Sequence, residues 1–166
     1  MQAAPSRYSA TAMTLHWLAA LLILATFPVG LYMVELPLSP WKLKVYSWHK
    51  WIGVTVFLLA LARLTWRMGH PAPTLPDGMR AWEKPLAGAV QALLYLLMLA
   101  IPLSGWLMSS AAGFQTVYLG LLPIPDLLAK DKDLADFLRW VHQYLTFWLG
   151  ALAGLHAAAA FKHLWI

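Results

Sequence analysis

Hydrophobic positions fall into four long runs, at about 12–34, 48–66, 86–110 and 139–164. A helix needs about 20 residues to cross roughly 30 Å of hydrocarbon. Only helices and closed barrels satisfy their backbone groups in lipid, and these runs lack the alternation of barrel strands. The pattern therefore predicts an all-α membrane protein, an antiparallel bundle of four transmembrane helices forming one domain over residues 1–166.

Proline-rich connections separate the runs. Prolines in 36–40 and in 70–76 end the first and second spans, because each proline disfavours helix at the residue before it. Short links make successive helices antiparallel, so both termini should share one side of the membrane. In the longest connection, 111–138, we expect a short surface helix.

Composition narrows the candidate chemistry. The chain is 61% hydrophobic and 11% charged, against about half and a quarter in soluble domains. It has no cysteine, which excludes disulfides, thiolate metal sites and covalent c-type haem. The 12 Lys and Arg residues divide evenly between the two sides of the bundle, so the positive-inside rule leaves the orientation open.

Four of the six histidines lie inside or at the edge of predicted spans, namely His16, His49, His142 and His156. An ionisable side chain there is costly and usually marks a functional site. His142 and His156 are fourteen residues apart, which is about 21 Å of helix rise and about 40° short of four full turns. Both imidazoles therefore point to nearly the same side of the fourth span.

Depth in the membrane groups the histidines into two pairs. His16 and His156 lie toward the side of the termini, whereas His49 and His142 open their spans on the opposite side. Zinc would require three or four clustered ligands, and no carboxylate lies at either depth. Two opposed pairs at two depths suit two haems, each ligated by two imidazoles from facing helices.

Other residues extend this interpretation. Arg63 follows His49 by fourteen residues and should face the bundle at the depth of His16, where it could bind a haem propionate; snorkelling to the interface is an equally good explanation. Gly53, Gly150 and Gly154 leave room for a macrocycle, although simple helix packing explains the last two as well. His70 lies in a proline-rich loop, where we expect it to be solvated.

The chain resembles the bacterial cytochrome b561 family, and within it the diheme superoxide oxidases. The resemblance covers nearly the whole chain in order, and its most specific part is the set of four histidines together with the run from Gly154 to Ala160. The segments that carry it are Arg7-Tyr8, Leu15-His16-Trp17, His49-Lys-Trp-Ile-Gly53, Arg63-Leu-Thr-Trp-Arg67, Pro71-Ala-Pro73, Ile101-Pro-Leu-Ser-Gly105, Trp140-Val-His142, Gly154-Leu-His156-Ala-Ala-Ala-Ala160 and His163.

The resemblance implies an activity and a location. Termini would be cytoplasmic at the bacterial inner membrane. Periplasmic superoxide would give electrons to an outer haem b on His49 and His142, which pass to an inner haem b on His16 and His156 and then to ubiquinone. His163, one heptad beyond His156, could hydrogen-bond the quinone, although an interfacial role is the simpler explanation. The cations that could steer superoxide are Lys42, Lys44, Lys50 and Arg139.

Two other functions remain open from the sequence. The chain could be the cytochrome subunit that links a dehydrogenase or hydrogenase to the quinone pool. It could also be a small membrane transporter or a haem-handling protein that uses histidines as transient ligands. Lipid, ubiquinone and superoxide are the expected partners, with a redox partner protein as a further candidate; nothing indicates nucleic acid.

Overall fold

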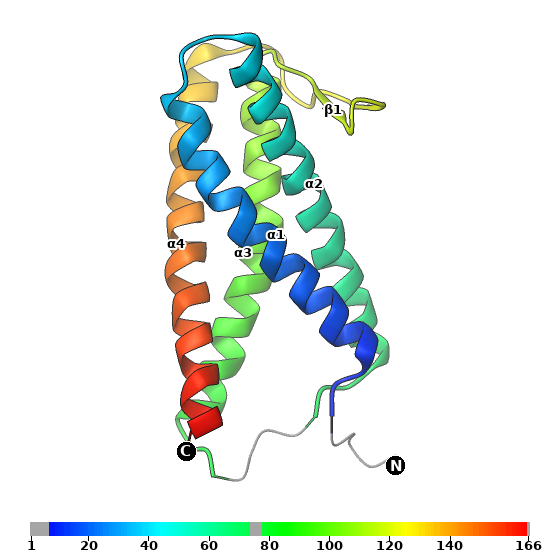
Figure 1. Cartoon of the computed structure of the whole chain (residues 1–166), viewed down its shortest axis with the longest axis vertical. Coiled ribbons are helices and arrows are strands. Elements are labelled where there is room, and N and C mark those ends of the chain that lie inside the picture. Colours follow the sequence, from blue (N-terminus) through cyan, green and yellow to red (C-terminus); the bar gives the residue numbers. More distant parts are fainter. Residues whose placement is uncertain (1–6, 74–77, 166) are drawn as a thin grey trace.

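Long helices dominate the fold, as a computed structural model shows for residues 7–73 and 78–165, with side chains up to residue 161. Within these residues the elements are α1 (Ala10–Glu35), α2 (Pro40–Gly69), α3 (Glu83–Ala111), β1 (Thr116–Tyr118), β2 (Leu122–Ile124) and α4 (Lys132–Trp165). The helices run alternately up and down, and both ends of the chain lie at the same end of the bundle (Figure 1). The predicted four-helix membrane bundle is confirmed.

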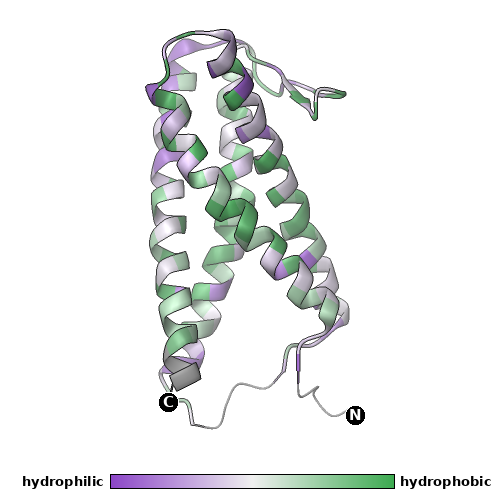
Figure 2. Ribbon diagram, in the orientation of Figure 1, coloured by the Kyte–Doolittle hydropathy of each residue, from purple (hydrophilic) through white to green (hydrophobic). Residues whose placement is uncertain are grey.

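Each helix is long and apolar enough to cross a membrane. Hydrophobic residues cover the middle of the bundle (Figure 2). Many large apolar side chains point outward; Leu21, Leu24 and Leu31 of α1 are 61%, 71% and 62% exposed. Such a surface is stable when lipid chains cover it, because lipid tails are as apolar as these side chains.

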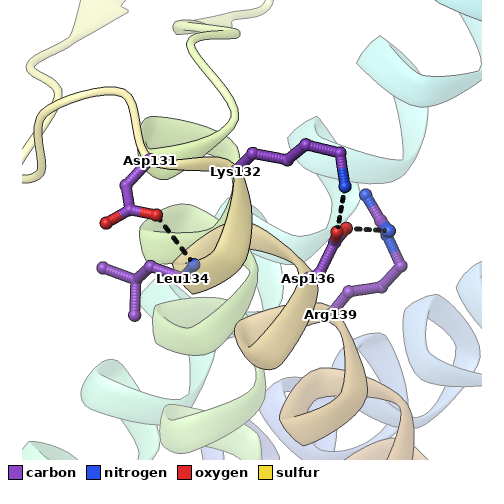
Figure 3. A network of polar contacts seen from close by, with 5 residues as sticks. All are labelled: Asp131, Lys132, Leu134, Asp136 and Arg139. Carbon is purple, nitrogen blue, oxygen red and sulfur yellow. Dashed lines mark hydrogen bonds and ion pairs between the residues drawn. The ribbon is translucent and has the colours of Figure 1, made fainter.

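Capping residues extend two helices beyond the predicted spans. The hydroxyl of Ser39 accepts a hydrogen bond from the N–H of Lys42, and Pro40 occupies the first turn of α2. At α4, the carboxylate of Asp131 accepts from the N–H of Leu134 at 3.0 Å (Figure 3). These caps satisfy backbone donors that would otherwise lack partners. Thus α2 and α4 begin before the hydrophobic runs, and their first histidines lie within the helices rather than at their starts.

Small residues bring the helices together. Helix α1 packs on α2, α2 on α3, and α3 on α4. The buried cluster at the centre of the bundle consists of Ala19, Val56, Ala60 and Met98. Ala19 and Ala60 are almost inaccessible, and their short side chains allow the backbones of α1 and α2 to approach closely.

A β-hairpin packs beside α2 at one end of the bundle, where we expected a short surface helix; that prediction was wrong. Strands β1 and β2 pair antiparallel, and a turn at Gly120, with φ of 72°, joins them. A two-stranded hairpin is marginal alone, and here α2 supports it. Trp51 donates its indole N–H to the carbonyl of Val117 at 2.7 Å, and the hydroxyls of Thr55 and Tyr118 are 2.9 Å apart.

We predict that Gly113→Ala lowers the stability of this end of the bundle. Gly113 has φ of 76°, and a Cβ there would lie 3.2 Å from Cδ of Lys130. The left-handed conformation alone costs a side-chain-bearing residue roughly 1–2 kcal/mol. Thermal unfolding in detergent should show a lower Tm than for Gly69→Ala, whose added methyl meets no atom within 4 Å. Equal melting temperatures would contradict the expected strain.

Candidate functional site

The four histidines of the spans form two facing pairs. His16 of α1 faces His156 of α4, with ring centroids 6.3 Å apart and ring planes at 74°. His49 of α2 faces His142 of α4, with centroids 6.2 Å apart and planes at 76°. We call His16 and His156 the inner pair, because they lie toward the end with the termini, and His49 and His142 the outer pair.

The ring separations fit two imidazoles on one metal ion. With metal–nitrogen distances of about 2 Å on opposite sides of the ion, imidazole centroids lie about 6 Å apart. Aromatic rings in edge-to-face contact also lie about 4.5–7 Å apart. The centroid distance therefore does not distinguish a metal site from an aromatic contact, and the direction of the ring nitrogens is needed. That direction is set by the hydrogen bonds of the rings.

His142 holds a proton on Nδ1. Its Nδ1 lies 3.0 Å from the carbonyl oxygen of Ile101 and 3.1 Å from the hydroxyl of Ser104. A carbonyl only accepts, so Nδ1 is the donor and Nε2 is left with its lone pair. Such a hydrogen bond at one nitrogen fixes which nitrogen is free to bind a metal.

His49 has a similar support from α1. Its Nδ1 lies 3.2 Å from the hydroxyl of Thr26. Two glycines give both outer rings access to these partners. Each follows a hydrogen-bonding residue by one helical turn: Gly30 follows Thr26, and Gly105 follows Ile101. A Cβ at either glycine would lie 3.1 Å from Cε1 of the ring.

Each histidine pair could supply only two ligands, so a metal bound there would need its other ligands from a group that the protein does not provide. Among residues 7–73 and 78–161, no three His, Asp or Glu side chains come together as a metal-binding group. Each pair supplies two imidazoles only, which suits an iron that already has four porphyrin nitrogens. A Cβ on Gly53, one turn after His49, or on Gly154 would meet nothing within 4 Å. Residues at both depths therefore fit haem.

Sequence comparisons agree with this geometry. The family model described as "Prokaryotic cytochrome b561" matches residues 7–166. The chain belongs to the prokaryotic cytochrome b561 family. It is therefore a membrane electron-transfer protein of a haem b family.

Similar proteins include members with and without a stated activity. "Cytochrome b561 homolog 2" of Escherichia coli (strain K12) is 32% identical over 160 residues, covering 96% of this chain and 85% of the relative. "Probable superoxide oxidase CybB" of Yersinia pestis is 27% identical, covering 95% and 88%. "Cytochrome b561 homolog 1" of Escherichia coli (strain K12) is 25% identical, covering 97% and 92%.

Arg63 of this cytochrome b561 lies near the inner pair. It is within electrostatic range of His16, and its guanidinium lies 5.3 Å from the centre of the Tyr95 ring on α3. Among the described residues, neither Arg63 nor Arg67 forms a salt bridge. Arg63 thus interacts electrostatically with His16 and packs over the ring of Tyr95.

The cations predicted to steer superoxide interact with neighbouring carbonyl, aromatic or carboxylate groups at the outer end of the bundle. Lys42 donates to the carbonyl of Leu36, Lys44 lies 5.3 Å from the ring centre of Trp48, and Lys50 donates to the carbonyl of Phe114. Arg139 and Lys132 both bind Asp136 (Figure 3). One carboxylate thus offsets part of the positive charge at the start of α4.

The structure gives defined contacts for two further residues considered from the sequence, Gly150 and His70. Gly150 lies against the ring of Phe27, 3.5 Å from where its Cβ would be, so it serves packing between α4 and α1. His70 stacks on Trp66 at 3.9 Å, away from both pairs. The side chain of His163 lies outside the described residues.

Sequence reasoning missed the roles of Thr26, Gly30, Ser104 and Gly105. The segment Ile101–Gly105 is part of the family resemblance, but nothing in its sequence indicates which side chain of another helix it contacts. Thr26 and Gly30 follow the same spacing of four residues as Ile101 and Gly105. This repeated spacing, with Pro28 inside the first segment and Pro102 inside the second, is the sequence signal that could have indicated their roles.

We predict that Gly105→Ala reduces haem content. The added methyl would press on Cε1 and Nδ1 of His142, at 3.1 and 3.3 Å, and disturb the bond to Ile101. Disturbing a hydrogen-bonding partner of a metal ligand typically costs about 10–100-fold in affinity. Haem per chain should fall in the purified protein, while Gly69→Ala retains the wild-type ratio. Full haem content in Gly105→Ala would show that the ring tolerates the contact.

Proposed function

We propose that this cytochrome b561 transfers electrons from superoxide to ubiquinone through two haem b groups. His49 and His142 would hold the outer haem, and His16 and His156 the inner haem. The observation that carries the proposal is the facing of two imidazole pairs at two depths, with centroid separations of 6.2 and 6.3 Å. The similarity to a probable superoxide oxidase over 95% of the chain supports the substrate.

Oxidation of two superoxide anions to two O₂ supplies two electrons, which together with two protons convert ubiquinone to ubiquinol. When bound, each haem would exchange one electron at a time, and the two imidazoles that hold it would keep O₂ from binding the iron. Lys42, Lys44, Lys50 and Arg139 would attract the superoxide anion to the outer end. The chain's own residues therefore set where the electron enters.

On the inner side, Arg63 would bind a haem propionate with a charge-assisted hydrogen bond. His163 would donate a hydrogen bond to a quinone carbonyl and deliver a proton, since imidazole exchanges protons near neutral pH. This assignment places the termini in the cytoplasm and the chain in the bacterial inner membrane. Lipid, ubiquinone and superoxide are then its partners.

We expect the purified protein to reduce ubiquinone with superoxide alone, and His49→Ala to abolish this. Loss of one outer ligand should remove one haem of two, measured as pyridine haemochrome per chain, and with it the superoxide-dependent appearance of ubiquinol. His70→Ala is the matched control, because that imidazole stacks on Trp66 and faces neither pair. A wild-type protein that reduces quinone only when a dehydrogenase is added would reject superoxide as the donor.

Lys44→Gln should slow the reaction with superoxide about twofold at low ionic strength. Steering by a charged surface raises association rates and weakens as salt screens it. Stopped-flow rates should therefore depend less steeply on salt in Lys44→Gln than in the wild type. Lys84→Gln removes the same charge near the start of α3, at the end with the termini, and should leave the rate unchanged. Equal effects of the two substitutions would argue against steering at the outer end.

A further inference from the structure

The two histidine pairs differ in what supports their rings. Both outer rings have a hydrogen-bonding partner at Nδ1: Thr26 for His49, and Ile101 with Ser104 for His142. Neither His16 nor His156 has a hydrogen bond to another residue within the described part of the chain. Instead, His16 has the positive charge of Arg63 within electrostatic range.

Two separate sets of hydrogen bonds, one at each outer ring, orient the Nδ1 protons. Ser104 donates its hydroxyl proton to the carbonyl of Ile101 at 2.8 Å, so its oxygen is free to accept from Nδ1 of His142. His49 is half-buried, and a ring that turns Nε2 toward a metal must carry its proton on Nδ1 and donate it to Thr26. Both outer imidazoles are thus donors to oxygen.

Donation from Nδ1 makes an imidazole a stronger electron donor through Nε2. A stronger donor stabilises the oxidised, more positive iron and lowers its reduction potential, because second-shell hydrogen bonding is one of the controls on haem potential. A nearby cation has the opposite effect, since it stabilises the state that holds the extra electron. Arg63 would therefore raise the potential at the inner pair by offsetting the negative charge of a haem propionate.

We infer that Thr26, Ser104 and the carbonyl of Ile101 are positioning groups that hold the outer centre at a lower reduction potential than the inner centre. This inference rests on the two-haem arrangement of the proposed function. It gives a direction to electron transfer: an electron that enters at the outer pair moves toward the inner pair with a favourable driving force. Of these groups, Thr26 is the easiest to test by substitution, because its side chain alone supplies the hydrogen bond to His49.

Potentiometric titration of the purified holoprotein tests the inference through the visible spectrum, without any assay of activity. The outer centre is identified as the one whose absorption disappears in His49→Ala. In the wild type, the outer centre should be oxidised at ambient potentials where the inner centre is already reduced. The reverse order would overturn the inference.

Thr26→Val removes the hydroxyl with little change in volume. We expect the ratio of ferrous to ferric outer centre at a fixed ambient potential to rise about tenfold, which is about 59 mV for a one-electron couple. The inner centre should not shift. Thr26→Ser keeps a hydroxyl and should restore the wild-type value, which a loss of packing alone would not.

Thr65→Val is the matched control, because the hydroxyl of Thr65 bonds only to carbonyls of its own helix, at Leu61 and Ala62. Both potentials should stay at their wild-type values there. An unchanged outer potential in Thr26→Val would overturn the role of Thr26. If the potentials follow the expected order but superoxide does not reduce the protein, the proposed donor fails and the inference stands.

Discussion

Imidazoles within a hydrocarbon layer are stabilised by partners for their ring nitrogens, and at the outer pair this constraint determines which residues surround the rings. An unpaired polar group in such surroundings costs several kcal/mol. His142 donates Nδ1–H to the carbonyl of Ile101, which leaves Nε2 with its lone pair, and its ring faces that of His49. A metal between the two rings would give Nε2 its partner, so the hydrogen bonds that stabilise His142 in the membrane would also prepare it as a ligand.

The four helices contribute differently to the histidine pairs. Helices α1, α2 and α4 carry the four histidines, whereas α3 carries none of them. Its contribution is the support of His142 through Ile101, Ser104 and Gly105, which explains polar and small residues in the middle of an otherwise apolar span. The hairpin fastened to α2 by Trp51 adds contacts two residues beyond His49. The two outer histidines are therefore positioned by residues that are not themselves proposed as ligands.

Charge is arranged along the bundle in a way that suits one-directional electron transfer. Cations at the outer end are partly offset by Asp136, whereas Arg63 has no salt bridge among the described residues and interacts electrostatically with His16. Ring donors at the outer pair and a cation at the inner pair shift the two proposed centres in opposite directions. A family-level description as a haem electron-transfer protein does not include this asymmetry, which depends on individual side chains.

Sequence alone determined the four spans and the two depths of the histidines, because span length and helical periodicity are local properties of the chain. Tertiary structure decided what surrounds each imidazole. Thr26 and Gly105 act on histidines 23 and 37 residues away, and no local pattern says which helix face lies opposite. The hairpin at 116–124 was missed for the same reason: two short strands are marginal alone, and the indole of Trp51 and the hydroxyl of Thr55 on the distant helix α2 support them.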